Sequence, residues 1–299
     1  MTARPAGRGL REKLSNPKAD RIKQVAALAG RSASGAGART STSAGRAARE
    51  RSGLFLIEGP QAVRELVRFQ ADLVRDVYVN DAALTGNAGI VDAALEAGLF
   101  VHPVTDEVSA AISGDSQGIV AVARMWDVGA EISAIIPAGA RLVAIFSSVR
   151  DPGNAGTVVR VADAAGADLV VLAGESVDIF NPKVVRATAG SLFHVPVARG
   201  ISVADAVAAV HDLGLQVLAA DGGGTIELGA LGAATAGAGA PNLASPTAWL
   251  FGNEAHGLTA DEIALADHSV RIPIFGKAES LNLAAAAAVS LYASALARK

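Results

Sequence analysis

Residues 141–173, "RLVAIFSSVRDPGNAGTVVRVADAAGADLVVLA", contain the pattern that decides the fold. An apolar strand is predicted over residues 141–149, a helix over residues 154–167 and a second strand over residues 168–173. That second strand and the later "TAWLFG" (residues 247–252) are apolar throughout, which is typical of strands covered by helices on both faces. The pattern predicts an α/β fold with a doubly wound, mainly parallel sheet, which binds ligands beyond the carboxyl ends of its strands.

Length and composition set the broad class of the protein. A chain of 299 residues with 51% hydrophobic content is long enough for two domains with cores of their own. No uninterrupted apolar run is long enough to span a membrane, and the N-terminus lacks the apolar centre of a signal peptide. We therefore expect a cytoplasmic protein without a membrane partner.

Cysteine and histidine usage limits the possible chemistry. The chain has no cysteine, which excludes disulfides, thiolate nucleophiles and cysteine-ligated metals. Its five histidines are scattered, and none forms an H-x-x-x-H pair on a predicted helix. We therefore predict no metal site.

Charge is distributed unevenly along the chain. Residues 1–52 carry twelve Lys and Arg against three acidic residues, a balance of +9 in a chain whose overall charge is -3. A basic segment on an acidic body favours a polyanionic partner such as RNA, because phosphate binding releases counterions. The alternative is a solvated, partly disordered tail.

The order of apolar segments and loops predicts two domains. Residues 31–52 are rich in Ser, Ala, Gly and Arg without apolar periodicity, as in a flexible linker. Two series of alternating strand and helix patterns follow, and a connector separates them. The predicted parts are a basic, partly flexible arm (1–52), a smaller N-terminal α/β domain (53–127), a linker (128–140) and the parallel-sheet domain (141–299).

Three loops that follow predicted strands carry polar residues. In the first loop, Asn154 is a suitable N-cap for the helix that also carries Arg160. The second loop, "LFGNEAHGL" (residues 250–258), combines Gly252 with the acid/base candidates Glu254 and His256. In the third loop, Ser280 is a suitable N-cap for an Ala-rich helix. Each loop taken alone is also compatible with an ordinary capped helix or a polar turn.

The glycine run at residues 222–224 follows a predicted strand, as a dinucleotide-binding loop would. No G-x-G-x-x-G pattern is present and no helix opens after the run, which argues against a nucleotide-dependent oxidoreductase. The chain also lacks a P-loop.

Taken together and in this order, the three loops resemble the signature motifs of the SpoU/TrmH family of RNA ribose 2′-O-methyltransferases, in the SPOUT superfamily. The matching segments are "DPGNAGTVVRVADAAGA", "LFGNEAHGL" and "IPIFGKAESLNLAAAAAVSLYA". The segment "NPKVVRATAGSLFHVPV" is also similar to the family, and residues 53–125 resemble its ribosomal-protein-like substrate-binding domain. Two small departures are Leu283 and Ala284, where the family usually has Val and Ser.

The resemblance implies a trefoil knot in the catalytic domain, a homodimer with active sites completed across the interface, and S-adenosylmethionine as methyl donor. It implies an RNA substrate, which the N-terminal domain indicates is ribosomal RNA, and we expect 23S rRNA. The catalytic positions that it implies are Asn154, Arg160, Glu254, Ser280 and Asn282. The donor pocket that it implies contains Leu250, Gly252, Ile272, Pro273 and Leu281.

The implied reaction transfers a methyl group from a sulfonium to a ribose hydroxyl, which requires alignment and loss of a proton. A guanidinium holds its proton too tightly to act as a base, so we expect Arg160 to clamp an RNA phosphate, in the partner subunit's site. Three alternatives stay open. They are a transfer-RNA 2′-O-methyltransferase, a thiostrepton-type resistance methyltransferase and a non-catalytic RNA-binding or ribosome-assembly factor.

Overall fold

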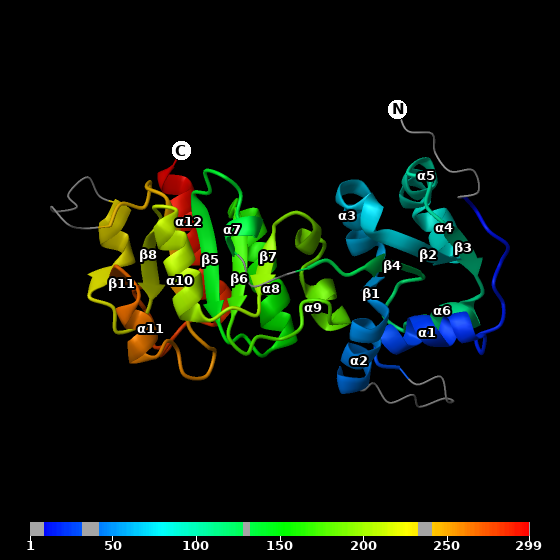
Figure 1. The fold of residues 1–299 in the computed structure, drawn as a ribbon, viewed down its shortest axis with the longest axis horizontal. Coiled ribbons are helices and arrows are strands. Elements are labelled where there is room, and N and C mark those ends of the chain that lie inside the picture. The colour runs from blue at the N-terminus through cyan, green and yellow to red at the C-terminus, as the bar shows by residue number, and fades with distance from the viewer. Residues whose placement is uncertain (1–8, 32–41, 128–131, 233–240, 299) are drawn as a thin grey trace. The chain divides into compact units, whose positions relative to one another are not determined.

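The computed structural model describes residues 9–31, 42–127, 132–232 and 241–298. The chain divides into two compact units (Figure 1). Unit 1 comprises residues 1–126 and 178–193, and unit 2 comprises residues 127–177 and 194–299. Part of the predicted arm (residues 1–8 and 32–41) and part of the predicted linker (residues 128–131) lie outside the described residues.

Unit 1 is built on a four-stranded sheet with the order β1-β4-β2-β3. Strand β4 runs antiparallel to both neighbours, and β2 and β3 are parallel. The strands are β1 (Leu54–Glu58), β2 (Val74–Asn80), β3 (Val101–Val104) and β4 (Ile119–Arg124). The helices are α1 (Asp20–Leu28), α2 (Thr42–Ser52), α3 (Pro60–Phe69), η1 (Ala71–Leu73), α4 (Asp81–Gly86), α5 (Ala88–Glu96), α6 (Asp106–Ile112), α9 (Pro182–Ala187) and η2 (Ser191–Phe193).

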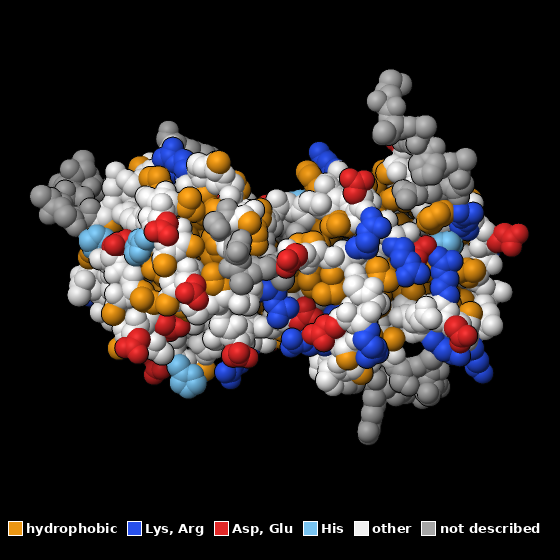
Figure 2. All heavy atoms as spheres, in the orientation of Figure 1, with side chains coloured by type: hydrophobic (Ala, Val, Ile, Leu, Met, Phe, Trp, Pro, Cys, Tyr) orange, Lys and Arg blue, Asp and Glu red, His pale blue; other side chains and the backbone are white. Residues whose placement is uncertain are grey.

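The described parts of the predicted basic arm belong to the folded unit. Helix α1 buries Ile22, Val25 and Leu28 in a core shared with β1, β2, β4 and α6. The apolar spacing of α1 therefore outweighs its basic composition, because burial of these side chains stabilises the helix. Figure 2 shows Lys and Arg side chains gathered over the face of unit 1 that holds α1 and β2.

Residues 178–193, which were predicted to lie within the parallel-sheet domain, cluster with unit 1. The Arg49 guanidinium donates to Asp178 Oδ2 over 2.8 Å, and both side chains are buried. Arg49 also donates to the Leu28 carbonyl oxygen, which ties α2 to α1. Breaking a buried ion pair leaves an uncompensated charge, so this contact fixes the segment to its unit.

Unit 2 is built on a seven-stranded sheet with the order β7-β6-β5-β10-β8-β11-β9. Every described pairing in it is parallel, as predicted for a doubly wound sheet. The strands are β5 (Leu142–Ser147), β6 (Leu169–Ala173), β7 (Val197–Arg199), β8 (Gln216–Ala220), β9 (Ile226–Glu227), β10 (Thr247–Phe251) and β11 (His268–Arg271). The central strand β10 is buried throughout and pairs with β5 and β8, which explains why its sequence does not alternate.

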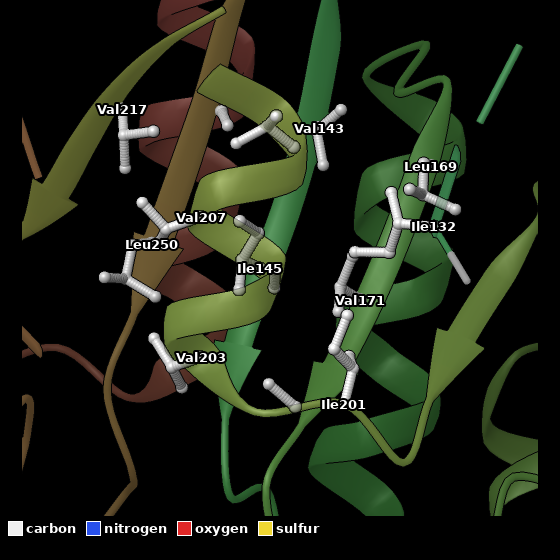
Figure 3. Close-up of a cluster of buried hydrophobic side chains, with 14 of the residues drawn as sticks. Ile132, Val143, Ile145, Leu169, Val171, Ile201, Val203, Val207, Val217 and Leu250 are labelled. Carbon is white, nitrogen blue, oxygen red and sulfur yellow. The ribbon is translucent and has the colours of Figure 1, made fainter. Parts of the chain in front are cut away.

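Helices cover both faces of this sheet. They are α7 (Ile132–Ile135), α8 (Pro152–Ala164), α10 (Val203–Asp212), η3 (Leu228–Gly232), α11 (Ala260–Ala264) and α12 (Leu283–Ala297). In Figure 3, Val203 and Val207 of α10 lie over Ile145 and Leu250 of the sheet, in a cluster that also contains Ile132 of α7. Helices α8 and α12 pack against each other and cover the opposite face.

The face under α12 carries the aromatic side chains of the sheet. Phe146 and Phe251 stack with ring centroids 4.9 Å apart on neighbouring strands. Trp249 is fully buried, and its Nε1 donates to Ser294 Oγ of α12 over 2.9 Å. This hydrogen bond satisfies a buried indole N–H and ties α12 to the middle of β10.

None of the helices in the described ranges is long and apolar enough to cross a membrane. The same described residues contain no group of three or more side chains of His, Cys, Asp or Glu placed to hold a metal ion.

Candidate active site

A cavity of about 500 Å³ opens at the carboxyl ends of β8 and β10. All three polar loops identified in the sequence contribute to its lining, as expected for a parallel sheet. An adjoining cavity of about 200 Å³ shares Ala220, Ser280, Leu281 and Ala286 with it and extends to the end of β11. The larger cavity is lined by Asn154, Ala220, Phe251, Gly252, Asn253, Glu254, Ala255, Gly257, Ser280, Leu281, Asn282, Leu283 and Ala286.

Asn154 lies in the first turn of α8, and the cap of that helix is Asp151. The Asp151 side chain accepts a hydrogen bond from the Asn154 backbone N–H over 2.8 Å. The prediction that Asn154 is the N-cap is therefore wrong, because the helix begins at Pro152. The Asn154 amide is instead directed to the second loop, where its Nδ2 donates to Glu254 Oε1 over 3.2 Å.

The second loop is a tight turn held by Asn253. Its backbone exchanges two hydrogen bonds with Gly257, of 3.1 and 2.9 Å. Its side chain donates from Nδ2 to the Ser148 carbonyl oxygen over 2.8 Å, which ties the loop to the end of β5. Sequence reasoning missed this role of Asn253, although its position directly after a buried strand is the signal that points to it.

Residue 252 must be glycine because the two sides of this turn lie very close to each other. A Cβ at this position would lie 2.2 Å from the Gly257 carbonyl carbon and 2.3 Å from the Leu258 nitrogen. Both atoms belong to the backbone, so a larger residue would displace the turn that carries Glu254. His256, by contrast, is exposed at the tip of the turn and is not among the residues that line the cavity.

The loop also runs into an ordinary capped helix, as its sequence allows. Thr259 caps α11 and forms a capping box with Glu262. The other carboxylate oxygen of Glu262 accepts a hydrogen bond from Ser147 Oγ at the end of β5. The segment after β10 therefore both lines the cavity and leads into a capped helix.

At the start of α12, as at the start of α8, the residue that caps the helix is a different polar residue from the predicted one. The side-chain oxygen of Asn282 accepts a hydrogen bond from the Ala285 N–H over 2.7 Å and caps the helix. The prediction that Ser280 caps this helix is wrong, because helical geometry begins only at Leu283. Ser280 is exposed and lines both cavities, so its hydroxyl is accessible from them.

Only some of the residues predicted for the donor pocket line a cavity. Gly252 and Leu281 line the larger cavity, and Ile272 and Leu281 line the smaller one. Leu250 is fully buried in the core under α10. Pro273 is partly buried and is not among the residues that line either cavity.

Arg160 is exposed on α8 and is not among the residues that line the cavity with Asn154 and Glu254. One turn further along α8, the Ala164 carbonyl oxygen accepts a hydrogen bond from Tyr292 of α12 over 3.2 Å. Arg160 and Ala164 are one turn apart on α8, and α8 packs against α12. Helix α12 exposes Val289, Tyr292 and Leu296.

The cavities carry carboxylates and no cationic side chain. Glu254 lines the larger cavity, and Asp221 and Glu279 line the smaller one. Among the described residues that line either cavity there is no Lys or Arg. Sequence reasoning did not single out Asp221 or Glu279, although Asp221 directly follows β8 and Glu279 directly precedes Ser280.

Comparison with known proteins provides an independent test of the resemblance found in the sequence. The sequence pattern of the SpoU rRNA Methylase family matches residues 141–292. A 23S rRNA (guanosine(2553)-2′-O)-methyltransferase from Bacillus subtilis is 32% identical over 82% of this chain and 89% of its own length.

Solved structures with the same fold cover almost the whole chain. The AdoMet-bound rRNA methyltransferase from Sinorhizobium meliloti has a TM-score of 0.73 and 26% identity, over 95% of this chain and 97% of that one. The SpoU methyltransferase AviRb from Streptomyces viridochromogenes, in complex with AdoMet, has a TM-score of 0.73 and 27% identity, over 94% and 99%. With its three loops gathered at one edge of a parallel sheet, the chain belongs to the SpoU rRNA methylase family.

Proposed function

We propose that this protein transfers a methyl group from S-adenosylmethionine to a ribose 2′-hydroxyl in RNA, and that the RNA is 23S ribosomal RNA. The observation that carries the proposal is the hydrogen bond between Asn154 and Glu254 inside a cavity that Ser280 and Asn282 also line. Relatives named as 23S rRNA 2′-O-methyltransferases, from Bacillus subtilis and Bordetella pertussis, align over 80% or more of the chain and support ribosomal RNA over transfer RNA.

The residues at the cavity fit S-adenosylmethionine. This donor carries a sulfonium and an ammonium group, and the cavities offer carboxylates without a competing Lys or Arg among their described lining residues. Small residues such as Gly252, Ala220 and Ala286 leave room for it. Gly252, Ile272 and Leu281 would hold the donor from the two cavities, with Leu250 and Pro273 supporting the strand ends behind them. When bound, the donor supplies an activated methyl group.

The polar residues act on the RNA ribose. Asn154 and Ser280 orient the hydroxyl, since each presents a hydrogen-bonding group to the cavity. Asn282 uses its side-chain oxygen as the helix cap, which leaves its Nδ2 as a donor for the ribose. Glu254 positions Asn154 and accepts hydrogen bonds from donor or ribose.

Arg160 binds an RNA phosphate and stabilises the charge that develops on the ribose oxygen. Because its side chain is not among those lining the cavity of its own chain, the proposal places it at the cavity of a second copy. The exposed Val289, Tyr292 and Leu296 of α12 support a homodimer through this face, because a contiguous apolar stripe is costly to leave in water. The trefoil knot and a cytoplasmic location stay predictions.

The proposal assigns the RNA-binding role to the N-terminal part of the chain. Residues 53–127 would bind the RNA together with the basic residues 1–52, while residues 141–299, joined by the linker 128–140, would carry the transfer. A non-catalytic RNA-binding or ribosome-assembly factor is the alternative, and it predicts no donor binding.

The decisive experiment maps 2′-O-methyl groups in ribosomal RNA from cells with and without the gene. One lost ribose methylation in 23S rRNA, restored by the wild-type gene and not by an Arg160→Ala variant, is the expected result. An unchanged map, together with purified protein that binds no S-adenosylmethionine by calorimetry, would overturn the proposal in favour of the non-catalytic alternative.

A further inference from the structure

Unit 1 contains a groove lined by arginines that the proposed reaction does not use. Its floor is formed by Leu54 of β1, Arg75 of β2 and Val122 of β4, and its walls by α1 and α2. Arg21 of α1, Arg51 of α2 and Arg75 of β2 come from three different elements and line the same space of about 250 Å³. No Asp or Glu is among its described lining residues, so the groove is positively charged.

The buried carboxylate of Asp76 holds two of these arginines in place. Asp76 accepts a hydrogen bond from Arg21 Nη2 over 2.6 Å and lies 3.2 Å from Arg75 Nε. Asp76 is 4% exposed, whereas the side chains of Arg21 and Arg75 are 40% and 50% exposed. The pair of arginines therefore keeps a net positive charge and presents it to solvent.

Arg21 is held more firmly than an ordinary surface arginine. Its Nε donates to the Tyr78 hydroxyl over 2.8 Å, and its guanidinium carbon lies 5.5 Å from the Tyr78 ring centroid. Tyr78 stacks on His102 in turn, and both are buried. Burial by itself raises the pKa of Asp76, but the hydrogen bond with His102 and the charge of Arg21 outweigh it and keep the pKa below its ordinary value.

We infer that the groove formed by Arg21, Arg51 and Arg75 binds the phosphate backbone of the RNA substrate. A preorganised guanidinium such as that of Arg21 loses little side-chain entropy when it binds a phosphate. Arg51 is exposed and has no ion pair or hydrogen bond among the described residues, so its donors are available to the same ligand. The groove is also too small for a folded partner to enter, but a phosphate group with its sugar fits it.

This inference rests on the proposal that RNA is the substrate. It goes beyond that proposal by assigning affinity for the RNA to three named residues far in sequence from the transfer site. The contacts are to phosphate, so they position the RNA without reading its bases.

The test compares two double variants of the full-length protein. Arg51→Gln with Arg75→Gln removes two charges from the groove, and Arg64→Gln with Arg68→Gln removes two exposed charges from α3 as a matched control. Binding of a 23S rRNA transcript is measured by fluorescence anisotropy between 50 and about 300 mM salt. Calorimetric binding of S-adenosylmethionine and the thermal unfolding temperature report on folding.

We expect the groove variant to bind the transcript about tenfold or more weakly, with a salt slope reduced by about 1 for each arginine removed. The control is expected to stay within about twofold of wild type. A groove variant with unchanged Kd and salt slope would overturn the inference even if the wild-type protein methylates RNA. If the wild type binds RNA through the groove and transfers no methyl group, the inference stands and the proposed reaction fails. Should the double variant unfold, the single Arg51→Gln, which has no partner to lose among the described residues, decides the question by the same slope.

Discussion

Asn154 Nδ2 donates to Glu254 Oε1 over 3.2 Å, although 100 positions separate the two residues in the chain. The contact joins the start of α8 to the loop after β10. It is possible because β5 and β10 are adjacent and parallel, so the loops that follow them meet at one edge of the sheet. The first prediction follows from this contact.

Replacing Asn154 by Ala should lower methyl transfer by about 100-fold and leave the free energy of unfolding nearly unchanged, because Asn154 is not the cap of α8. Asp151→Ala is the matched variant, and it should cost about 1 kcal/mol of stability through loss of the cap. Single-turnover transfer to an RNA transcript and urea unfolding measure the two effects. Equal losses of stability in both variants would contradict the assignment.

The second prediction concerns the site shared between two copies. Arg160→Ala and Glu254→Gln should each lose about 100-fold or more in activity. Mixing the two inactive proteins should restore activity to about a quarter of wild type, since half of the mixed dimers' sites contain neither change. The measurement is transfer rate after co-refolding or subunit exchange, with each variant alone as control. An inactive mixture that still forms dimers would show that Arg160 acts on its own chain's cavity.

The third prediction concerns the turn that carries Glu254. Gly252→Ala should destabilise unit 2 by about 1 to 3 kcal/mol and abolish donor binding, because its Cβ would overlap the backbone of Gly257 and Leu258. Gly276→Ala is the control, since a Cβ there meets no atom within 4 Å. Chemical unfolding and calorimetry compare them, and a Gly252→Ala protein with wild-type donor affinity would refute the steric argument.

The fourth prediction separates the two polar residues before α12. Asn282→Ala should lower both stability, by about 1 kcal/mol, and activity, because the residue caps the helix and lines the cavity. Ser280→Ala should lower activity without a measurable change in stability, because Ser280 lies outside the helix. Thermal unfolding and transfer rates distinguish them. A loss of stability in Ser280→Ala matching that of Asn282→Ala would contradict the observed cap.

The fifth prediction is a pH dependence in unit 1. The folded-state pKa of Asp76 lies below its ordinary value near 3.8, so its ionised form stabilises the fold above that value, and this contribution is lost as pH falls through the folded pKa. Asp76→Asn should therefore cost about 1.5 to 3 kcal/mol at pH 7, and the difference from wild type should shrink as the pH falls below about 3.8. Urea unfolding of both proteins across this range measures it. A difference that grows on acidification would reverse the sign of the argument.

The hydrophobic pattern of the sequence was sufficient to predict a parallel sheet covered on both faces and to predict which loops form the site. Strands that are apolar throughout, such as residues 169–173, indicate cover on both faces, and the parallel seven-stranded sheet agrees. Polar loops after such strands must lie at their carboxyl ends, which is where the cavity opens. The three motifs together also identified the family, which the match over residues 141–292 confirms.

The sequence by itself thus determined the fold class, the family and the three loops that form the cavity, because hydrophobic periodicity and motif order are local properties of the chain. Tertiary structure decided which polar residue in each loop is a cap and which is free: Asp151 rather than Asn154, and Asn282 rather than Ser280. A helix that begins two or three residues earlier or later changes the roles of its neighbours, and propensity alone does not resolve such a shift. Tertiary packing also placed α1 in a core and drew residues 178–193 to unit 1, since both depend on partners distant in sequence.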